Sequence, residues 1–483
     1  MNTIIYYCEY MVRTRVYRQA ASHFLGLFVL SLALLGALTQ MSAIQTWLSQ
    51  ATGEPANLVI DTQGITGPLN TPWRYLAQGG ESPDYQIAPV LKELTAIKPK
   101  AMRLDHLFDY YATVSFSPTG SVQVDWTKLD ILLKDLHAAS VSPMLALSYM
   151  PPALSATGDI TAAPNRWSDW STLVRLTIEH VSGLQALNLP NVYYEVWNEP
   201  DLFGGWKAGG GKNYFTLYEQ SVLGATAAQN VQPFFLGGPA TTSLYPNWLT
   251  KFMDYVSQRQ LRLDFYSWHI YDPDPQTYLN QLQQFDRLMR QYPSYLFKVE
   301  PIITEWGPTS ALSSIYDQNL SAAHLVAVSA VLPPTLKQAY LFEFQDGENP
   351  QGDTYWGRWG LLTSPSSGNL KKPRYQALNF LNRLGEQALS VAGQGTWVKA
   401  IAATDSTGTL KVIVANYDPQ DKHTETVPLN FVRVTPGTYT LTTEYLGRPP
   451  QTTTLTAITT TLQSSLPLPP NTVVFLNLSS TLP

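Results

Sequence analysis

The sequence predicts a (β/α)8 barrel followed by a smaller all-β domain, and three observations lead to this fold class. Between residues 55 and 385 a short apolar run, a polar or aromatic loop and a stretch with helical spacing recur in turn. From residue 386 to residue 483 Thr, Val, Pro and Gly become frequent, and alternation replaces helical spacing. The length of 483 residues suits one large domain and a smaller one.

Eight apolar or β-branched runs are the predicted barrel strands. They start roughly 30 to 50 residues apart, which leaves room for a crossover helix between parallel strands. An open, doubly wound sheet is the alternative, but residues 61–66 lack the glycine-rich phosphate loop that usually follows its first strand. Eight βα units therefore favour a TIM barrel. The runs are 58–61, 101–105, 143–148, 192–197, 234–237, 265–269, 302–305 and 339–344, and helical spacing is clearest in 126–139, 167–186, 278–291 and 373–386.

The residues after 386 are expected to form a β-sandwich. The Thr-rich stretch at 452–461 fits a strand pair better than a glycosylated stalk. A packing role beside the barrel and glycan binding are both open for this domain. Five further runs have the alternation typical of sandwich strands, namely 398–403, 410–417, 425–432, 437–445 and 473–478.

The N-terminus combines a basic tail, residues 1–20, with an apolar segment at 21–45. Apart from Ser31, residues 24–38 are apolar, and with 39–44 they reach membrane-spanning length, roughly 20 residues. The arginines in the tail would stay in the cytoplasm, so we expect an anchor that places the rest of the chain outside, in a periplasm or at the cell surface. A cleaved signal peptide is the alternative, with 49–51 as a cleavage site and a secreted product.

Charge and composition exclude one class of partner and favour another. The formal net charge is −5, and the only basic cluster lies in the N-terminal tail, so nucleic acid is not an expected partner. The chain contains 13 Trp and 27 Tyr, which suits contacts with sugars, although core packing explains many of these rings. Oligomeric state is left open.

Two glutamates stand at the ends of predicted strands. Glu199 follows the run 192–197 by two residues and directly precedes a proline, and Glu305 closes the run 302–305. Both therefore lie at the carboxyl-terminal face of the barrel, where active sites of this fold are found. One carboxylate that attacks an anomeric carbon and one that protonates the leaving oxygen are what retaining glycosidic cleavage requires, about 5 to 5.5 Å apart. Asn198 could bond a sugar 2-hydroxyl, while Glu195 is expected to be a buried, paired structural carboxylate.

Several ordered segments resemble glycoside hydrolase family 39, a clan A family of β-xylosidases, α-L-iduronidases and some exopolysaccharide endoglycosidases. The resemblance covers residues 58–385 and implies Glu199 as acid/base and Glu305 as nucleophile. It also implies that Arg103 keeps Glu305 ionised, that His106 contacts sugar hydroxyls, and that His269 and Tyr271 flank the glutamates, with Tyr271 donating to Glu305. Satisfied core histidines are the alternative for both imidazoles. The segments are Arg103-Leu104-Asp105-His106, Trp197-Asn198-Glu199-Pro200, Gly237-Gly238-Pro239-Ala240, residues 264–271, Thr304-Glu305-Trp306, Gly360-Leu361-Leu362 and Lys372-Pro373-Arg374-Tyr375.

The last predicted strand departs from the β-xylosidase pattern. Leu341-Phe342-Glu343-Phe344-Gln345-Asp346 stands where those members carry Trp-Thr-Phe-Ser-Asp, which puts xylose specificity in question. The loop that follows could wall the substrate site, with Asp346 and Trp356 as candidate sugar contacts and core packing as the alternative.

The expected function is retaining hydrolysis of an extracellular polysaccharide by double displacement, inside the chain rather than at its end. An anchored barrel resembles the exopolysaccharide-processing members of the family. The alternatives are an exo-acting β-xylosidase-like hydrolase, a transglycosylase that uses the same intermediate, and a non-catalytic glycan-binding or assembly protein. The chemistry needs no cofactor and no metal, and the histidines outside the site show no metal-ligand spacing such as HExxH.

Overall fold

The computed structural model describes residues 53–79, 82–155 and 157–480. The predicted membrane anchor at 21–45 lies outside these residues. Within the described ranges, no helix combines the length and apolar character needed to cross a membrane.

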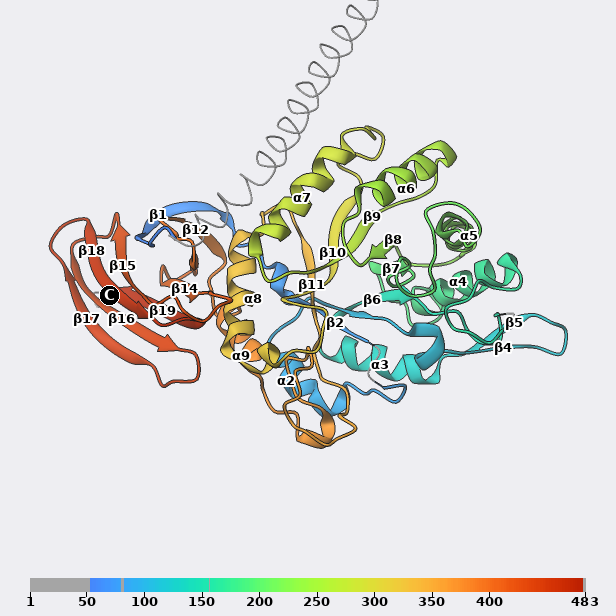
Figure 1. Cartoon of the computed structure of the whole chain (residues 1–483), viewed down its shortest axis with the longest axis horizontal. Helices are drawn as coiled ribbons and strands as arrows, with labels where there is room; N and C mark the ends of the chain where they lie inside the picture. The colour runs from blue at the N-terminus through green and yellow to red at the C-terminus, as the bar shows by residue number, and fades with distance from the viewer. Residues whose placement is uncertain (1–52, 80–81, 156, 481–483) are drawn as a thin grey trace, which may run out of the picture. The chain divides into compact units, whose positions relative to one another are not determined.

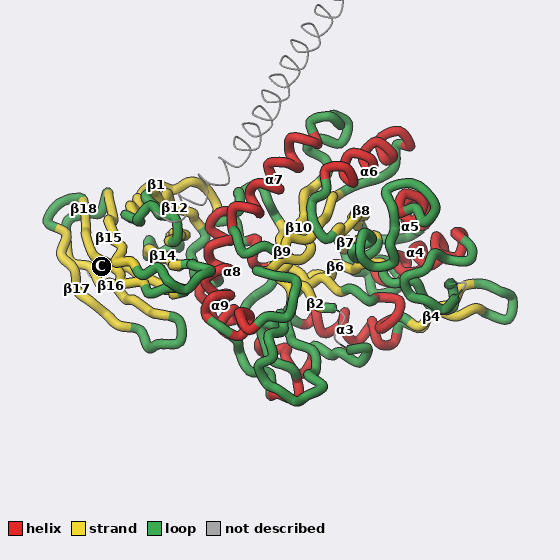
Figure 2. The backbone as a smooth tube through the Cα atoms, viewed as in Figure 1, coloured by secondary structure: helices red, strands yellow, loops and turns green. Residues whose placement is uncertain are grey.

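The larger part of the fold is a closed barrel of eight parallel strands, as the sequence predicts, which excludes the open doubly wound sheet. Neighbouring strands pair in chain order, and the last pairs with the first. Figure 1 shows the strands at the centre of this part, and Figure 2 shows the helices around them. The strands are β2 (Tyr75–Gln78), β3 (Ala101–Leu104), β6 (Ser142–Leu147), β7 (Val192–Val196), β8 (Phe234–Thr241), β9 (Phe265–Tyr271), β10 (Glu300–Gly307) and β11 (Gln338–Phe342).

A helix follows each barrel strand, and an apolar stripe on the helix packs against the barrel. In α4, for example, Trp170, Leu173, Val174 and Ile178 are buried, which is the i, i+3, i+4, i+8 spacing of a helix face. A short hairpin of β4 (Thr113–Phe116) and β5 (Val122–Asp125) precedes α3. The helices are α2 (Leu91–Ala96), α3 (Thr127–Ala138), α4 (Trp167–Val181), α5 (Tyr214–Ala227), α6 (Pro246–Arg259), α7 (Pro275–Met289), α8 (Asn319–Val331) and α9 (Pro373–Leu381).

The second part is a nine-stranded sheet whose two edge strands, β17 and β18, contact each other. It encloses an apolar core of its own. The Thr-rich stretch 452–461 supplies most of β17 and the first residue of β18, but these strands pair with β16 and β15 and not with each other, so the expected strand pair is wrong. In sheet order the strands are β17 (Gln451–Ala457), β16 (Gly437–Tyr445), β19 (Thr472–Ser480), β14 (Leu410–Asn416), β13 (Val398–Thr404), β12 (Gln387–Ala392), β1 (Leu58–Pro68), β15 (Glu425–Val432) and β18 (Thr461–Leu468).

The expected first barrel strand, 58–61, is wrong. These residues begin β1, which pairs antiparallel with β12 and parallel with β15 in the nine-stranded sheet. The first barrel strand is instead β2, only four residues long, which follows the turn Pro72–Arg74. An apolar run shows that a strand is buried but not which sheet it joins, so the chain contributes one strand to the all-β part before it enters the barrel.

Helix α8 joins the two cores, because it contacts β13, β14 and β19. Strand β14 is buried on both faces: Val412 and Val414 point into the core of the sheet, whereas Ile413 and Ala415 belong to the core shared with the barrel. Burial on both faces accounts for its nearly continuous apolar sequence.

Candidate active site

The two glutamates that the sequence predicts to be catalytic lie at the carboxyl ends of the fourth and seventh barrel strands, as expected. Glu305 is part of β10, and Glu199 comes three residues after the end of β7. The backbone of Glu199 has a φ of 45°, a left-handed conformation that non-glycine residues rarely adopt. Its N–H donates to the carbonyl of Ala240 at the end of β8, over 2.9 Å. The neighbouring strand therefore fixes the backbone of Glu199 in this strained conformation.

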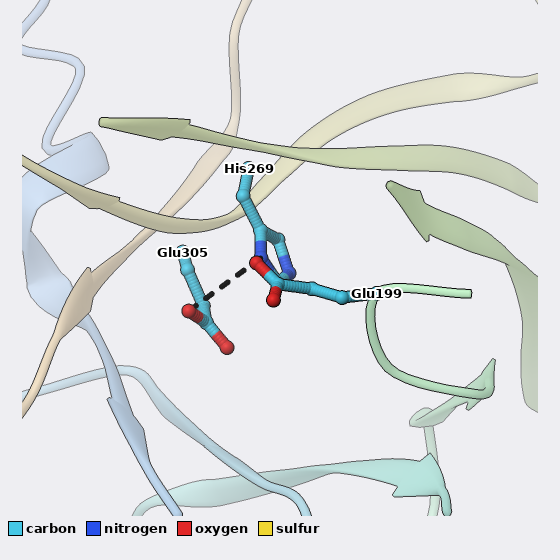
Figure 3. A group of neighbouring side chains, drawn as sticks. All are labelled: Glu199, His269 and Glu305. Carbon is cyan, nitrogen blue, oxygen red and sulfur yellow. Dashed lines mark hydrogen bonds and ion pairs between the residues drawn. The ribbon is translucent and has the colours of Figure 1, made fainter. Parts of the chain in front are cut away.

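Glu199 comes from the loop after β7, and His269 and Glu305 come from the neighbouring strands β9 and β10; Figure 3 shows the three side chains converging. The Nδ1 atom of His269 lies 2.8 Å from Oε1 of Glu199 and 3.5 Å from Oε2 of Glu305. One oxygen of each carboxylate and a ring nitrogen lie within 4.8 Å of one another. This limit agrees with the roughly 5 Å between the carboxyl groups of retaining enzymes and is shorter than the roughly 6.5 to 9.5 Å of inverting enzymes.

Arg103 connects Glu305 to two other residues at strand ends. Its Nε donates to Glu195 over 2.7 Å, Nη1 to Glu305 over 2.9 Å and Nη2 to the side-chain carbonyl of Asn198 over 2.8 Å. Arg103 is 1% exposed and Glu195 is fully buried, which confirms the expectation of a paired structural carboxylate. The guanidinium thus fixes the orientation of Glu305 and of Asn198 together.

The electrostatic environment of Glu305 differs from the expectation in one respect. Burial raises its pKa to about 7, although His269 and Arg103 both act to lower it. For His269, burial lowers the pKa, but Glu305 and the hydrogen bond to Glu199 outweigh burial, so that the pKa lies above its usual value. Arg103 does stabilise the ionised nucleophile, as the resemblance implies, yet desolvation of the carboxylate is the larger effect.

Tyr271 and His106 also lie at this end of the barrel. The Tyr271 hydroxyl donates to Oε2 of Glu305 over 2.8 Å, as expected. His106 follows β3, has its Nδ1 2.7 Å from Asp109, and packs edge-on against Tyr149 at 4.8 Å between ring centroids. Its contact with a sugar stays a prediction.

Tyr149 is a site residue that the sequence analysis missed. Its hydroxyl accepts a hydrogen bond of 2.8 Å from the side-chain amide of Asn198. Tyr149 follows β6 by two residues, so a polar aromatic residue at the end of the third strand was the signal that could have identified it.

Asp346 and Trp356 are not joined to this hydrogen-bonded cluster. Asp346 is 2% exposed, its Oδ2 lies 2.7 Å from Nζ of Lys372, and its Oδ1 accepts from the backbone N–H of Gly360. We therefore correct the expectation that it contacts the sugar: it holds the loop after β11 in place. Trp356 is half-buried and packs under the guanidinium of Arg358, 5.3 Å from the ring centroid, so a sugar contact stays a prediction there.

The trio of Glu199, His269 and Glu305 offers three atoms close enough to hold a small cation. Arg103 already places a positive charge on Glu305. That the chemistry needs neither metal nor cofactor stays a prediction.

A parallel barrel with two carboxylates at the ends of strands four and seven is the arrangement that retaining glycosidic cleavage requires. The model of the family described as Glycosyl hydrolases family 39 matches residues 60–429. The chain belongs to this family, as the sequence motifs indicate.

Known relatives agree with this assignment. A β-xylosidase from Geobacillus stearothermophilus is 26% identical over 304 residues, which cover 56% of this chain and 58% of that protein. The chain therefore spans somewhat under two thirds of the length of this relative. Among solved structures, a monomeric β-xylosidase from Caulobacter crescentus CB15 has a TM-score of 0.71 at 20% identity and covers 88% of this chain and 100% of its own. A GH39 enzyme from Xanthomonas axonopodis pv. citri has a TM-score of 0.72 at 18% identity, with 89% and 98% covered.

Proposed function

We propose that this chain hydrolyses β-glycosidic bonds within an extracellular polysaccharide by double displacement. The observation that carries the reaction type is the arrangement of Glu199 and Glu305 within 4.8 Å around His269. Exposed apolar side chains in four βα loops of the catalytic face support a polymeric substrate over a single terminal sugar. They are Leu202, Phe203, Tyr245, Leu312 and Tyr355.

In the first step, Glu305 attacks the anomeric carbon while Glu199 gives its proton to the glycosidic oxygen. The bond between carbon and leaving oxygen breaks, and a glycosyl ester of Glu305 forms. In the second step, Glu199 takes a proton from water, the hydroxide attacks the same carbon, and Glu305 leaves as a carboxylate. Arg103 and Tyr271 donate to Glu305 and so stabilise the charge that the carboxylate carries before and after the reaction.

An exo-acting β-xylosidase is the second candidate. The named relative from Geobacillus stearothermophilus favours it, whereas the sequence 341–346 departs from the β-xylosidase pattern. Digestion of a panel of β-linked polysaccharides, with sizing of the early products, separates the two. Mixed oligosaccharides at low conversion support internal cleavage, and monosaccharide alone supports the exo mode. Products that NMR shows with inverted anomeric configuration would sink the double-displacement mechanism for either.

The location of the protein is a further part of this proposal and depends on sequence alone. Arg13, Arg15 and Arg18 before the apolar residues 21–45 support an anchor with the barrel outside the cytoplasm. Membrane fractionation of cells that express the full chain tests this. A secreted product that begins near residue 52 would contradict the anchor and support a cleaved signal peptide.

A further inference from the structure

Two exposed apolar side chains follow directly after the acid/base residue. In the loop after β7, Leu202 is 60% exposed and Phe203 is 40% exposed. Their backbone N–H groups both donate to the carbonyl of Glu199, over 2.9 and 2.7 Å. This turn fixes the position of both residues relative to the group that delivers the proton.

Both the backbone and the ring of Phe203 are held in place. The backbone carbonyl of Phe203 accepts a hydrogen bond from the indole N–H of Trp197 over 3.1 Å, and the ring packs edge-on against Tyr149, with 5.7 Å between ring centroids. Tyr149 in turn binds Asn198 and contacts His106, so a continuous row of rings runs from His106 to Phe203.

The adjacent loop after β8 carries a second exposed ring and is tied to the first loop. Asp201 accepts from both the backbone N–H and the hydroxyl of Thr242, and this hydroxyl lies 2.8 Å from that of Tyr245. Tyr245 is 40% exposed and precedes α6. The chain of contacts from Asp201 to Tyr245 holds both rings on neighbouring, connected loops.

We infer that Phe203 and Tyr245 form the leaving-group side of the substrate site, where they pack against the sugar units released in the first step. This inference rests on the proposed function. Glu199 protonates the glycosidic oxygen, so the departing part of the substrate extends past Glu199, on the side opposite the sugar that Glu305 attacks. The loop that continues from Glu199 is the part of the chain placed to meet it. An aromatic ring held rigidly and partly exposed can bury the apolar face of a pyranose with little loss of side-chain entropy.

With one sugar unit packed against each ring, the leaving group comprises at least two sugar units. The ligand is therefore an oligosaccharide or polymer chain, not a small alcohol. The exposed aromatic residues of these two loops thus have a role in substrate binding, which is separate from the reaction chemistry.

The test compares two substrates that carry the same sugar in the reacting position. One is the β-linked tetrasaccharide that the wild type cleaves best in the polysaccharide panel. The other is the corresponding β-glycosyl fluoride, whose leaving group is too small to reach either ring. We expect Phe203→Ala to lower the ratio of kcat/KM for the tetrasaccharide to kcat/KM for the fluoride about tenfold, and Tyr245→Ala to lower it about threefold.

Phe203→Tyr should keep the ratio of the wild type, because it retains the ring. Phe297→Ala is the matched control: this ring is 96% exposed but precedes β10, at the opposite end of the barrel, and should leave the ratio unchanged. An unchanged ratio in folded Phe203→Ala and Tyr245→Ala enzymes would overturn the inference while the hydrolase assignment stands. A wild type that cleaves neither kind of substrate would instead refute the proposed function and, with it, this inference.

Discussion

Replacing Glu305 by Gln should make the protein more stable relative to the wild type as the pH rises. Burial raises the pKa of Glu305 from 4.5 to about 7. Because the folded-state pKa lies above the unfolded value, the stability from the protonated carboxyl is fully present below pH 4.5 and is lost as the pH rises through 7. A difference of roughly 2.5 pH units at 1.36 kcal/mol each amounts to about 3 kcal/mol.

The Gln side chain does not titrate, so this loss is absent from the variant. Gln also lacks the ion pair that ionised Glu305 forms with Arg103, but the pKa of about 7 already includes this attraction, so it needs no separate correction. The change with pH is therefore the informative quantity. For a chain of this size the unfolding entropy is on the order of 1 kcal/mol/K, so about 3 kcal/mol corresponds to roughly 3 °C in Tm.

The assay is thermal unfolding of wild type and Glu305→Gln at pH 4.5 and at pH 8, followed by circular dichroism. The Tm of the variant minus that of the wild type should be about 3 °C more positive at pH 8. Glu386→Gln, at an exposed position, is the control and should show no such change. An equal Tm difference at both pH values would refute the reasoning that desolvation dominates at Glu305. Because the charge of Glu199 also acts to raise the pKa of Glu305, Glu199→Gln measured in parallel shows how much of the effect depends on the neighbouring carboxylate.

Three further predictions follow from the structure. Glu199→Gln should lower kcat on unactivated glycosides about 10²- to 10⁴-fold. It should largely spare the first step for dinitrophenyl glycosides, because their leaving group needs no proton. Equal losses of rate on both kinds of glycoside in stopped-flow measurements would contradict an acid role for Glu199. Asp346→Asn should lower the free energy of unfolding by about 2 kcal/mol, because it weakens a buried ion pair with Lys372. The KM for the tetrasaccharide should stay within about twofold of the wild-type value. A large rise in KM with an unchanged Tm would instead support a sugar-binding role for Asp346. Burial lowers the pKa of His324 to about 3, so the stability that the neutral imidazole contributes is present above pH 6.5 and is lost as the pH falls toward 3. His324→Gln should therefore unfold at lower pH than the wild type in an acid titration followed by tryptophan fluorescence. An unchanged midpoint would argue against a neutral imidazole at this position.

The fold could be predicted largely because its signals are local. A buried parallel strand needs a short apolar run, and a covering helix needs an apolar stripe, so the barrel strands from β3 onward were identified within a few residues. The prediction of the first barrel strand is wrong because it, too, depends on a local pattern alone. Residues 58–61 have the right local pattern, but pairing with β12 and β15 is decided by residues more than 300 positions away.

The candidate site was predictable where the motif itself carried the chemistry. Glu199 and Glu305 stand at strand ends, and parallel strands bring their carboxyl ends to one face, so the sequence implied that the two carboxylates meet. Asp346 misled because it also follows a strand. Its side chain instead forms an ion pair with Lys372, because a buried ammonium group is stabilised only when it has a partner such as a carboxylate.

By itself, the sequence determined the barrel, the reacting pair and the family, because each depends on residue type at a strand end or on spacing along the chain. Only the tertiary structure decided the hydrogen-bond partners and the pKa of Glu305. Arg103 reaches Glu195 across 92 positions and Glu305 across 202, and the burial that raises the pKa of Glu305 comes from many strands at once. Desolvation and ion pairing depend on distances in space, and a linear pattern of residues does not contain those distances.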